Sequence, residues 1–236
     1  LQRARAMGPP VPLRRSAEGF DLIAEIKLAS PSEGDLADGP ANIADRGREY
    51  AAAGACAISV LTEPTRFGGD NRHLAEVADA TAPLGVPVMA KDFFTAASQL
   101  CAARIAGAGG ALLILRMLPD DELQDMAALC AELGMFVLLE AFDREDLDRA
   151  AGLFAGSAGD GLLMGLNTRD LRSLRVDPER LAELAGDFPD GFSRVAESGI
   201  STVEDAAKAA GLGYDMALVG TALMRSPQPG GLVSDM

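Results

Sequence analysis

The sequence predicts an α/β protein, a single-domain (β/α)8 TIM barrel in which each of eight parallel strands is followed by a helix. Short apolar runs alternate with amphipathic stretches from residue 22 onward. The runs are almost continuously apolar, which is typical of parallel strands that helices cover on the outer face of the sheet. Eight strand–helix units in about 215 residues match the repeat number and size of such a barrel.

The predicted strands are rich in aliphatic residues, and stretches with helical periodicity follow them. The strands are expected at residues 22–27, 57–61, 87–91, 111–115, 136–140, 162–167, 194–197 and 216–219. The helices are expected at residues 42–53, 73–82, 95–106, 120–133, 144–153, 178–185, 202–210 and 221–224. Gly54 and Gly134 should end two helices, and Thr95 and Ser201 are the candidate N-caps of two others. An open, doubly wound sheet is the alternative, but no GxGxxG motif follows the first strand.

The domain organisation is expected to be simple. Residues 1–21 form a lead-in segment, because Pro9, Pro10 and Pro12 interrupt any periodicity there. A short helix is expected near residues 13–18. Residues 22–236 form the catalytic barrel domain, and no linker or second domain is visible.

Composition limits the classes of partner. The chain has 21 Lys and Arg against 35 Asp and Glu, a net charge of −14, which argues against binding of nucleic acid or an anionic membrane. No apolar run nears the ~20 residues of a membrane span, and no signal peptide is visible. Cys56, Cys101 and Cys130 lack metal-type spacing and are expected to be buried free thiols. We therefore expect a cytoplasmic protein, and a monomer.

The first predicted strand carries an acid and a base near its C-terminal end. Glu25 and Lys27 lie two residues apart, so both point to the same side of the strand. A half-buried pair of this kind is costly unless it has a function. A surface ion pair on an exposed edge strand is the alternative interpretation.

Polar residues end most of the later strands as well. Catalytic groups of a (β/α)8 barrel lie at the C-terminal ends of its strands. The residues at these ends are Lys91, Glu140, Asn167, Arg169, Glu197, Ser198, Gly199, Gly220 and Thr221. Their convergence predicts an active site at this mouth of the barrel, because unrelated surface charges would scatter to both ends.

The residue types at the mouth indicate the chemistry. The turns at Ser198-Gly199 and Gly220-Thr221 are suited to hold a phosphate through backbone N–H groups. The only histidine, His73, lies at a predicted helix start and is expected to be a solvated surface group. No nucleophile–base arrangement and no metal-ligand cluster is visible. The residues therefore predict acid–base catalysis by lysine and glutamate on a phosphorylated small molecule, without a metal or other cofactor.

The motifs resemble those of the indole-3-glycerol phosphate synthases of tryptophan biosynthesis. The resemblance extends from about residue 20 to residue 225. It rests on the runs EIKLASPS at 25–32, ISVLT at 58–62, FGG at 67–69, KDF at 91–93, Glu140, NTRDL at 167–171, ESGI at 197–200 and VGTALM at 219–224.

The resemblance implies a carboxy-lyase that closes the indole ring of 1-(2-carboxyphenylamino)-1-deoxy-D-ribulose 5-phosphate, with loss of CO₂ and water. It implies that Lys91 is the general acid, that Lys27 holds the substrate anions and that Glu140 moves a proton. Glu25 and Asn167 would orient these groups, and Glu197 would support them. The implied substrate and phosphate ligands are Ser30, Arg169, Ser198, Gly199, Gly220 and Thr221. The implied apolar slot for the aromatic ring consists of Pro31, Phe67, Phe93, Leu112 and Leu171.

Four positions depart from the family pattern: Leu28, Glu33, Ala96 and Ser98 stand where the family commonly has Arg, Lys, Asp and Tyr. A slow or repurposed paralogue is therefore one alternative. Another is a sister phosphate-binding barrel such as phosphoribosylanthranilate isomerase, but its cysteine base is absent from the first strand. A non-catalytic scaffold barrel is a third, but the acid–base residues are all present.

Overall fold

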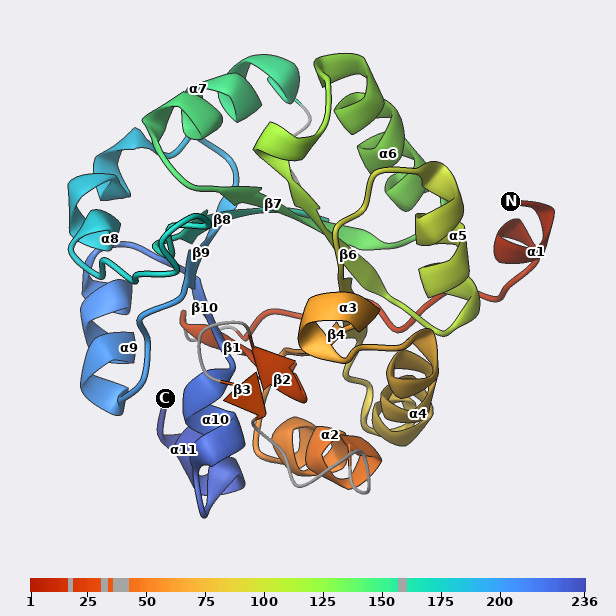
Figure 1. The fold of residues 1–236 in the computed structure, drawn as a ribbon, viewed down its shortest axis with the longest axis horizontal. Helices are drawn as coiled ribbons and strands as arrows, with labels where there is room; N and C mark the ends of the chain where they lie inside the picture. Colours follow the sequence, from red (N-terminus) through yellow and green to blue (C-terminus); the bar gives the residue numbers. More distant parts are fainter. Residues whose placement is uncertain (17–18, 31–33, 36–42, 157–160) are drawn as a thin grey trace.

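The computed structural model describes residues 1–16, 19–30, 34–35, 43–156 and 161–236. Its strands form a closed parallel barrel in the order β1-β10-β9-β8-β7-β6-β5-β4, which confirms the predicted (β/α)8 fold (Figure 1). The strands are β1 (Asp21–Ile26), β4 (Ala57–Leu61), β5 (Val88–Lys91), β6 (Gly110–Ile114), β7 (Phe136–Ala141), β8 (Leu162–Asn167), β9 (Ser193–Glu197) and β10 (Met216–Val219). A short antiparallel hairpin of β2 (Ala29–Ser30) and β3 (Gly34–Asp35) follows β1 and was not predicted.

Helices surround the barrel as an outer ring (Figure 1). The predicted helices correspond to α2 (Ile43–Ala52), α4 (Asn71–Thr81), α5 (Ala97–Ile105), α6 (Asp120–Glu132), α7 (Arg144–Leu153), α8 (Arg180–Glu183), α9 (Val203–Gly211) and α10 (Thr221–Arg225). Helix α8 is only half as long as predicted. Helices α1 (Gln2–Arg5), α3 (Pro64–Phe67) and α11 (Pro229–Asp235) were not predicted. No helix in the described residues is long and apolar enough to cross a membrane.

Two predicted N-caps are wrong by one residue. Helix α5 has Ala96 as its N-cap, and the side-chain oxygen of Gln99 accepts the N–H groups of Thr95 and Ala96 instead. Helix α9 is capped by Thr202 rather than Ser201, in a reciprocal capping box with Asp205. The predicted glycines follow α2 and α6 with φ of 108° at Gly54 and 72° at Gly134, a region that favours glycine.

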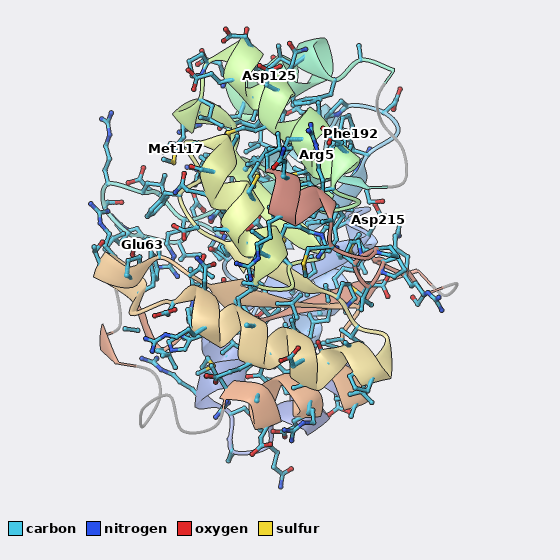
Figure 2. All side chains as sticks on the ribbon, turned by 90° about the vertical axis from the view of Figure 1, so that its right-hand side faces the viewer. Arg5, Glu63, Met117, Asp125, Phe192 and Asp215 are labelled. Atoms are coloured by element: carbon cyan, nitrogen blue, oxygen red, sulfur yellow. The ribbon has the colours of Figure 1, made fainter. Side chains whose placement is uncertain are left out.

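The lead-in segment lies against the N-terminal end of the barrel. Arg15 pairs with Asp215 at this end (2.9 Å), opposite the end at which Glu63 lies (Figure 2). Leu13 packs against the apolar cluster inside the barrel. Residues 13–16 are not helical, so the helix expected near 13–18 is wrong for its described part.

The barrel interior changes from apolar to polar along its axis. Its buried apolar cluster includes Ile23, Met89, Leu112, Phe136, Leu138, Leu163, Val195, Met216 and Leu218. Two residues further along the strands, the inward positions are Glu25, Lys91, Glu140 and Glu197. The apolar layer thus forms a floor beneath a layer of charged side chains at the C-terminal mouth.

Candidate active site

A cavity of about 920 Å³ opens at the C-terminal ends of the barrel strands. All the residues predicted to be catalytic line it, namely Glu25, Lys27, Lys91, Glu140, Asn167 and Glu197. The chain has three lysines, and two of them are in this lining; the third, Lys208, is exposed on α9. The cavity therefore brings two of the three lysine amines together with the buried carboxyls of Glu25, Glu140 and Glu197.

Lys91 lies between two carboxyl groups. Its Nζ atom is 3.2 Å from Oε1 of Glu140 on β7 and 3.5 Å from Oε2 of Glu197 on β9. Burial alone would lower the pKa of Lys91, but the carboxyls of Glu140, Glu197 and Glu25 outweigh burial and raise this pKa above its ordinary value. The amine is therefore held as an ammonium ion.

A chain of hydrogen bonds orients Glu140. The Nδ2 atom of Asn167 donates to Oε1 of Glu140 (2.8 Å), and the Oγ atom of Ser198 donates to Oδ1 of Asn167 (2.9 Å). The backbone N–H of Arg169 donates to the same Oδ1 atom (2.9 Å). These bonds fix which way the amide of Asn167 faces, and hence the carboxylate that it holds.

Glu25 and Lys27 form the ion pair that their spacing predicts, with 3.0 Å between Oε1 and Nζ. Burial would raise the pKa of Glu25, but the nearby ammonium groups of Lys27 and Lys91 outweigh it, and this pKa lies below its ordinary value. Glu25 is 4% exposed, so the alternative of an exposed surface pair is wrong.

Glu197 has a different environment from the other two carboxyls. Neither of its carboxyl oxygens has a hydrogen-bond partner among the described residues. Burial and the charge of Glu140 raise the pKa of Glu197 well above its ordinary value, and Lys91 offsets only part of this. Glu197 therefore holds its proton to a higher pH than an ordinary glutamate does.

The turns after β9 and β10 face the same cavity. Ser198 and Gly199 have φ of 65° and 81°, a left-handed conformation that is uncommon for serine. Ser198, Gly199, Gly220 and Thr221 all line the cavity. The backbone N–H groups of Gly199 and Gly220 make no hydrogen bond to another described residue. Both turns can therefore offer donors to an anion.

One wall of the cavity is apolar. The rings of Phe67 and Phe93 lie 6.4 Å apart at an angle of 53°, and Leu112 and Leu171 line the cavity with them. Pro31 lies outside the described residues, as does Glu33, and so does the side chain of Ser30. Among the positions that depart from the family pattern, neither Leu28 nor Ala96 nor Ser98 lines the cavity.

Sequence reasoning missed several lining residues. Ile114 and Leu218 face the cavity and continue the inward-facing alternation of β6 and β10, so their spacing could have identified them. Arg66 also lines the cavity, from the unpredicted helix α3. The signal for this helix was Glu63-Pro64: the Glu63 carboxylate accepts the N–H groups of Thr65 (2.9 Å) and Arg66 (2.7 Å).

The histidine and the three cysteines do not line the cavity. His73 is half-buried on α4 and does not line the cavity. The three cysteines are buried free thiols, as predicted, and burial raises the pKa of Cys56 and Cys130 to about 12. In the described part of the chain, no group of His, Cys, Asp and Glu side chains could hold a metal ion.

Comparisons with known proteins identify the family of the chain. Residues 9–235 match the family model for indole-3-glycerol phosphate synthase. The synthase of Nocardioides sp. is 41% identical over 227 residues, which is 96% of this chain and 83% of that protein. The synthase of Micrococcus luteus is 41% identical over 216 residues, covering 92% of this chain and 77% of that protein.

Solved structures share the fold at low sequence identity. Thiamine phosphate pyrophosphorylase from Pyrococcus furiosus has a TM-score of 0.63 and 15% identity, covering 91% of this chain and 92% of its own. A mandelate oxidase variant also has a TM-score of 0.63, with 19% identity, covering 94% of this chain and 73% of its own. These likenesses concern the barrel architecture, whereas the sequence matches reach the site. The chain therefore belongs to the indole-3-glycerol phosphate synthase family.

Proposed function

We propose that this cavity closes the indole ring of 1-(2-carboxyphenylamino)-1-deoxy-D-ribulose 5-phosphate, as expected of a carboxy-lyase of tryptophan biosynthesis. The ring carbon that bears the carboxylate attacks the ketone carbon, CO₂ leaves that ring carbon, and water is then eliminated to give indole-3-glycerol phosphate. The observation that carries the proposal is a single ammonium group, Lys91, held between two carboxyls in the mouth of a barrel of this family.

Lys91 is the proposed general acid for ring closure. The ketone oxygen gains negative charge as the new carbon–carbon bond forms, and it needs a proton donor at that moment. Lys91 is charged before substrate arrives, because Glu140 and Glu197 raise its pKa. Its proton can therefore pass to the oxygen once that oxygen has become the stronger base.

Lys27 is the proposed partner of the substrate's anionic groups and the acid for dehydration. Its side chain is 13% exposed and reaches the cavity, where the Glu25 carboxylate fixes its position at 3.0 Å. An anionic group of the substrate that lies beside both lysines would be attracted by their ammonium groups. Glu25 is thus a positioning residue for Lys27.

Glu140 is the proposed proton acceptor in the last step. Elimination of water requires loss of a proton from the ring carbon next to the anilino nitrogen, or from that nitrogen. The Glu140 carboxylate is oriented by Asn167 and adjoins Lys91, so it can take this proton close to the acid that acted first. Glu197 supports Lys91 from the other side.

The remaining lining residues suit the two ends of this substrate. The turns with Ser198, Gly199, Gly220 and Thr221 would bind the phosphate through their N–H groups, together with Ser30 and Arg169. The slot of Phe67, Phe93, Leu112 and Leu171, with Pro31, would take the aromatic ring. Every proposed catalytic residue falls within the proposed barrel domain, residues 22–236, beyond the lead-in 1–21.

The direct test is to mix the protein with the carboxyphenylamino-ribulose phosphate and follow indole absorbance and fluorescence. The chain has no tryptophan, so the protein's own signal is low. Turnover of phosphoribosylanthranilate instead would favour the sister isomerase, and turnover of neither would favour a repurposed paralogue or a scaffold. On its net charge of −14 and its composition we also propose a monomer that acts in the cytoplasm without binding nucleic acid or membrane.

A further inference from the structure

Gly165 on β8 faces the carboxyl group of Glu197. A Cβ atom at Gly165 would lie 2.0 Å from Oε1 and 3.0 Å from Cδ of Glu197, and real Cβ atoms essentially never have contacts below 3.0 Å. Gly165 does not have a positive φ, so its backbone conformation suits any residue. Its lack of a side chain is therefore a matter of space, and the space is occupied by the carboxyl group.

Gly220 faces the carboxyl group of Glu25 in the same way. A Cβ atom there would lie 2.2 Å from Oε1 and 3.0 Å from Cδ of Glu25. Its φ of −123° again does not require glycine. Among glycines in the described part of the chain, these two alone would put a Cβ within 3.0 Å of a carboxylate oxygen.

We propose that Gly165 and Gly220 are positioning residues, whose missing side chains leave the space in which Glu197 and Glu25 lie against the active-site lysines. The inference rests on the catalytic set proposed above. At Gly165 the added carbon would also lie 3.1 Å from Leu138 Cδ1, on the side away from Glu197, so it could not move away from the carboxyl. A methyl group would therefore push the Glu197 carboxyl off β8 and change its 3.5 Å approach to Lys91.

Gly220 then has a second role beside the phosphate contact expected of its N–H group. Any side chain at Gly220 meets Glu25 first, and the Cβ of Glu25 is itself only 3.2 Å from the added carbon. A substitution there would alter phosphate binding and the Glu25–Lys27 pair together. Gly165 lies on a strand, away from the two turns, and is the cleaner position to test.

Gly165→Ala should leave the fold intact, because the atom in conflict is the far end of a flexible side chain. The carboxyl oxygen must move by at least about 1 Å, and a misplacement of that size costs roughly 10²-fold in rate. We expect kcat to fall by about this factor with KM changed less than about threefold. Gly152→Ala on α7 is the matched control: nothing lies within 4 Å of its added carbon, so activity should stay at the wild-type level.

A second-site rescue separates positioning from a general structural effect. Glu197→Asp withdraws the carboxyl by one methylene group and makes room for the methyl. The single effects should then fail to multiply, and Gly165→Ala/Glu197→Asp should turn over at least about tenfold faster than their product predicts. Rescue of folding by the second change, should Gly165→Ala prove unstable alone, would support the same steric pair.

Several results would overturn the inference. Wild-type kcat in Gly165→Ala, effects that multiply in the double variant, or loss of fold in both variants would each show that the Glu197 carboxyl does not need this space. Glu197→Gln distinguishes this failure from failure of the catalytic assignment. If Glu197→Gln kept wild-type turnover, Glu197 itself would be dispensable whatever Gly165 does.

Discussion

Replacing Glu197 by glutamine should abolish a pH dependence of stability that the wild-type chain carries. The cluster holds two ammonium groups, Lys27 and Lys91, and three carboxyls whose side chains are 5% exposed or less. Two carboxylates balance the two ammonium ions, so a third ionised carboxyl would leave an unbalanced buried charge. Burial and the charge of Glu140 raise the pKa of Glu197, so Glu197 keeps its proton to a higher pH than an ordinary glutamate does.

The direction of this pH dependence follows from the difference in proton binding between the folded and the unfolded chain. In the unfolded chain the glutamate ionises near a pKa of about 4.3, whereas the folded chain holds the proton to higher pH. The stabilisation is complete below the unfolded pKa and is lost as the pH rises through the folded pKa. Between these two values the free energy of unfolding falls by about 1.4 kcal/mol per pH unit.

The assay is urea denaturation of wild type and Glu197→Gln at pH values from about 5 to 8. Glutamine has no proton to lose, so the variant should gain up to about 1.4 kcal/mol on the wild type with each pH unit between the unfolded and the folded pKa of Glu197. Glu122→Gln, an exposed change on α6, should follow the wild-type curve. Parallel curves for wild type and Glu197→Gln would show that Glu197 ionises normally and would refute the charge-balance argument.

Two further predictions concern other parts of the chain. Ala96→Asp should raise the free energy of unfolding by about 1 kcal/mol, because Ala96 is the N-cap of α5 without a capping side chain. Ala97→Asp, at the first residue of the helix, should raise this free energy less. Equal increases for the two variants in denaturation experiments would contradict a capping effect. Arg66→Glu should lower kcat/KM by roughly three- to tenfold at low salt and weaken its salt dependence, because Arg66 is an exposed cation at the mouth of a chain of charge −14. The exposed Arg3→Glu is its control, and the same loss in both variants would contradict steering at the mouth.

The parts of the site that sequence could predict are those set by strand alternation. Because side chains two apart share a face, Glu25 and Lys27 could be paired and the polar strand ends could be placed at one mouth. The same alternation would have identified Ile114 and Leu218. These are local rules, and the barrel repeats them on each strand.

One missed feature is local: the N-cap of α5 is Ala96, and Gln99 accepts the N–H groups of Thr95 and Ala96. The others depend on contacts between distant segments. The space at Gly165 is a property of Glu197 on the neighbouring strand, and no pattern around Gly165 indicates it. Which carboxyl keeps a proton likewise depends on three strands meeting at Lys91.

The measurement that tests the central claim most directly is the kcat of Lys91→Met for conversion of the carboxyphenylamino-ribulose phosphate to indole-3-glycerol phosphate. Loss of the general acid should lower kcat by at least ~10²-fold, since such a group contributes roughly 10²–10⁴-fold. Lys208→Met, which removes the exposed third lysine, should leave kcat unchanged. Near wild-type turnover by Lys91→Met, with the fold intact by circular dichroism, would contradict the assignment of the ammonium between Glu140 and Glu197 as the proton donor.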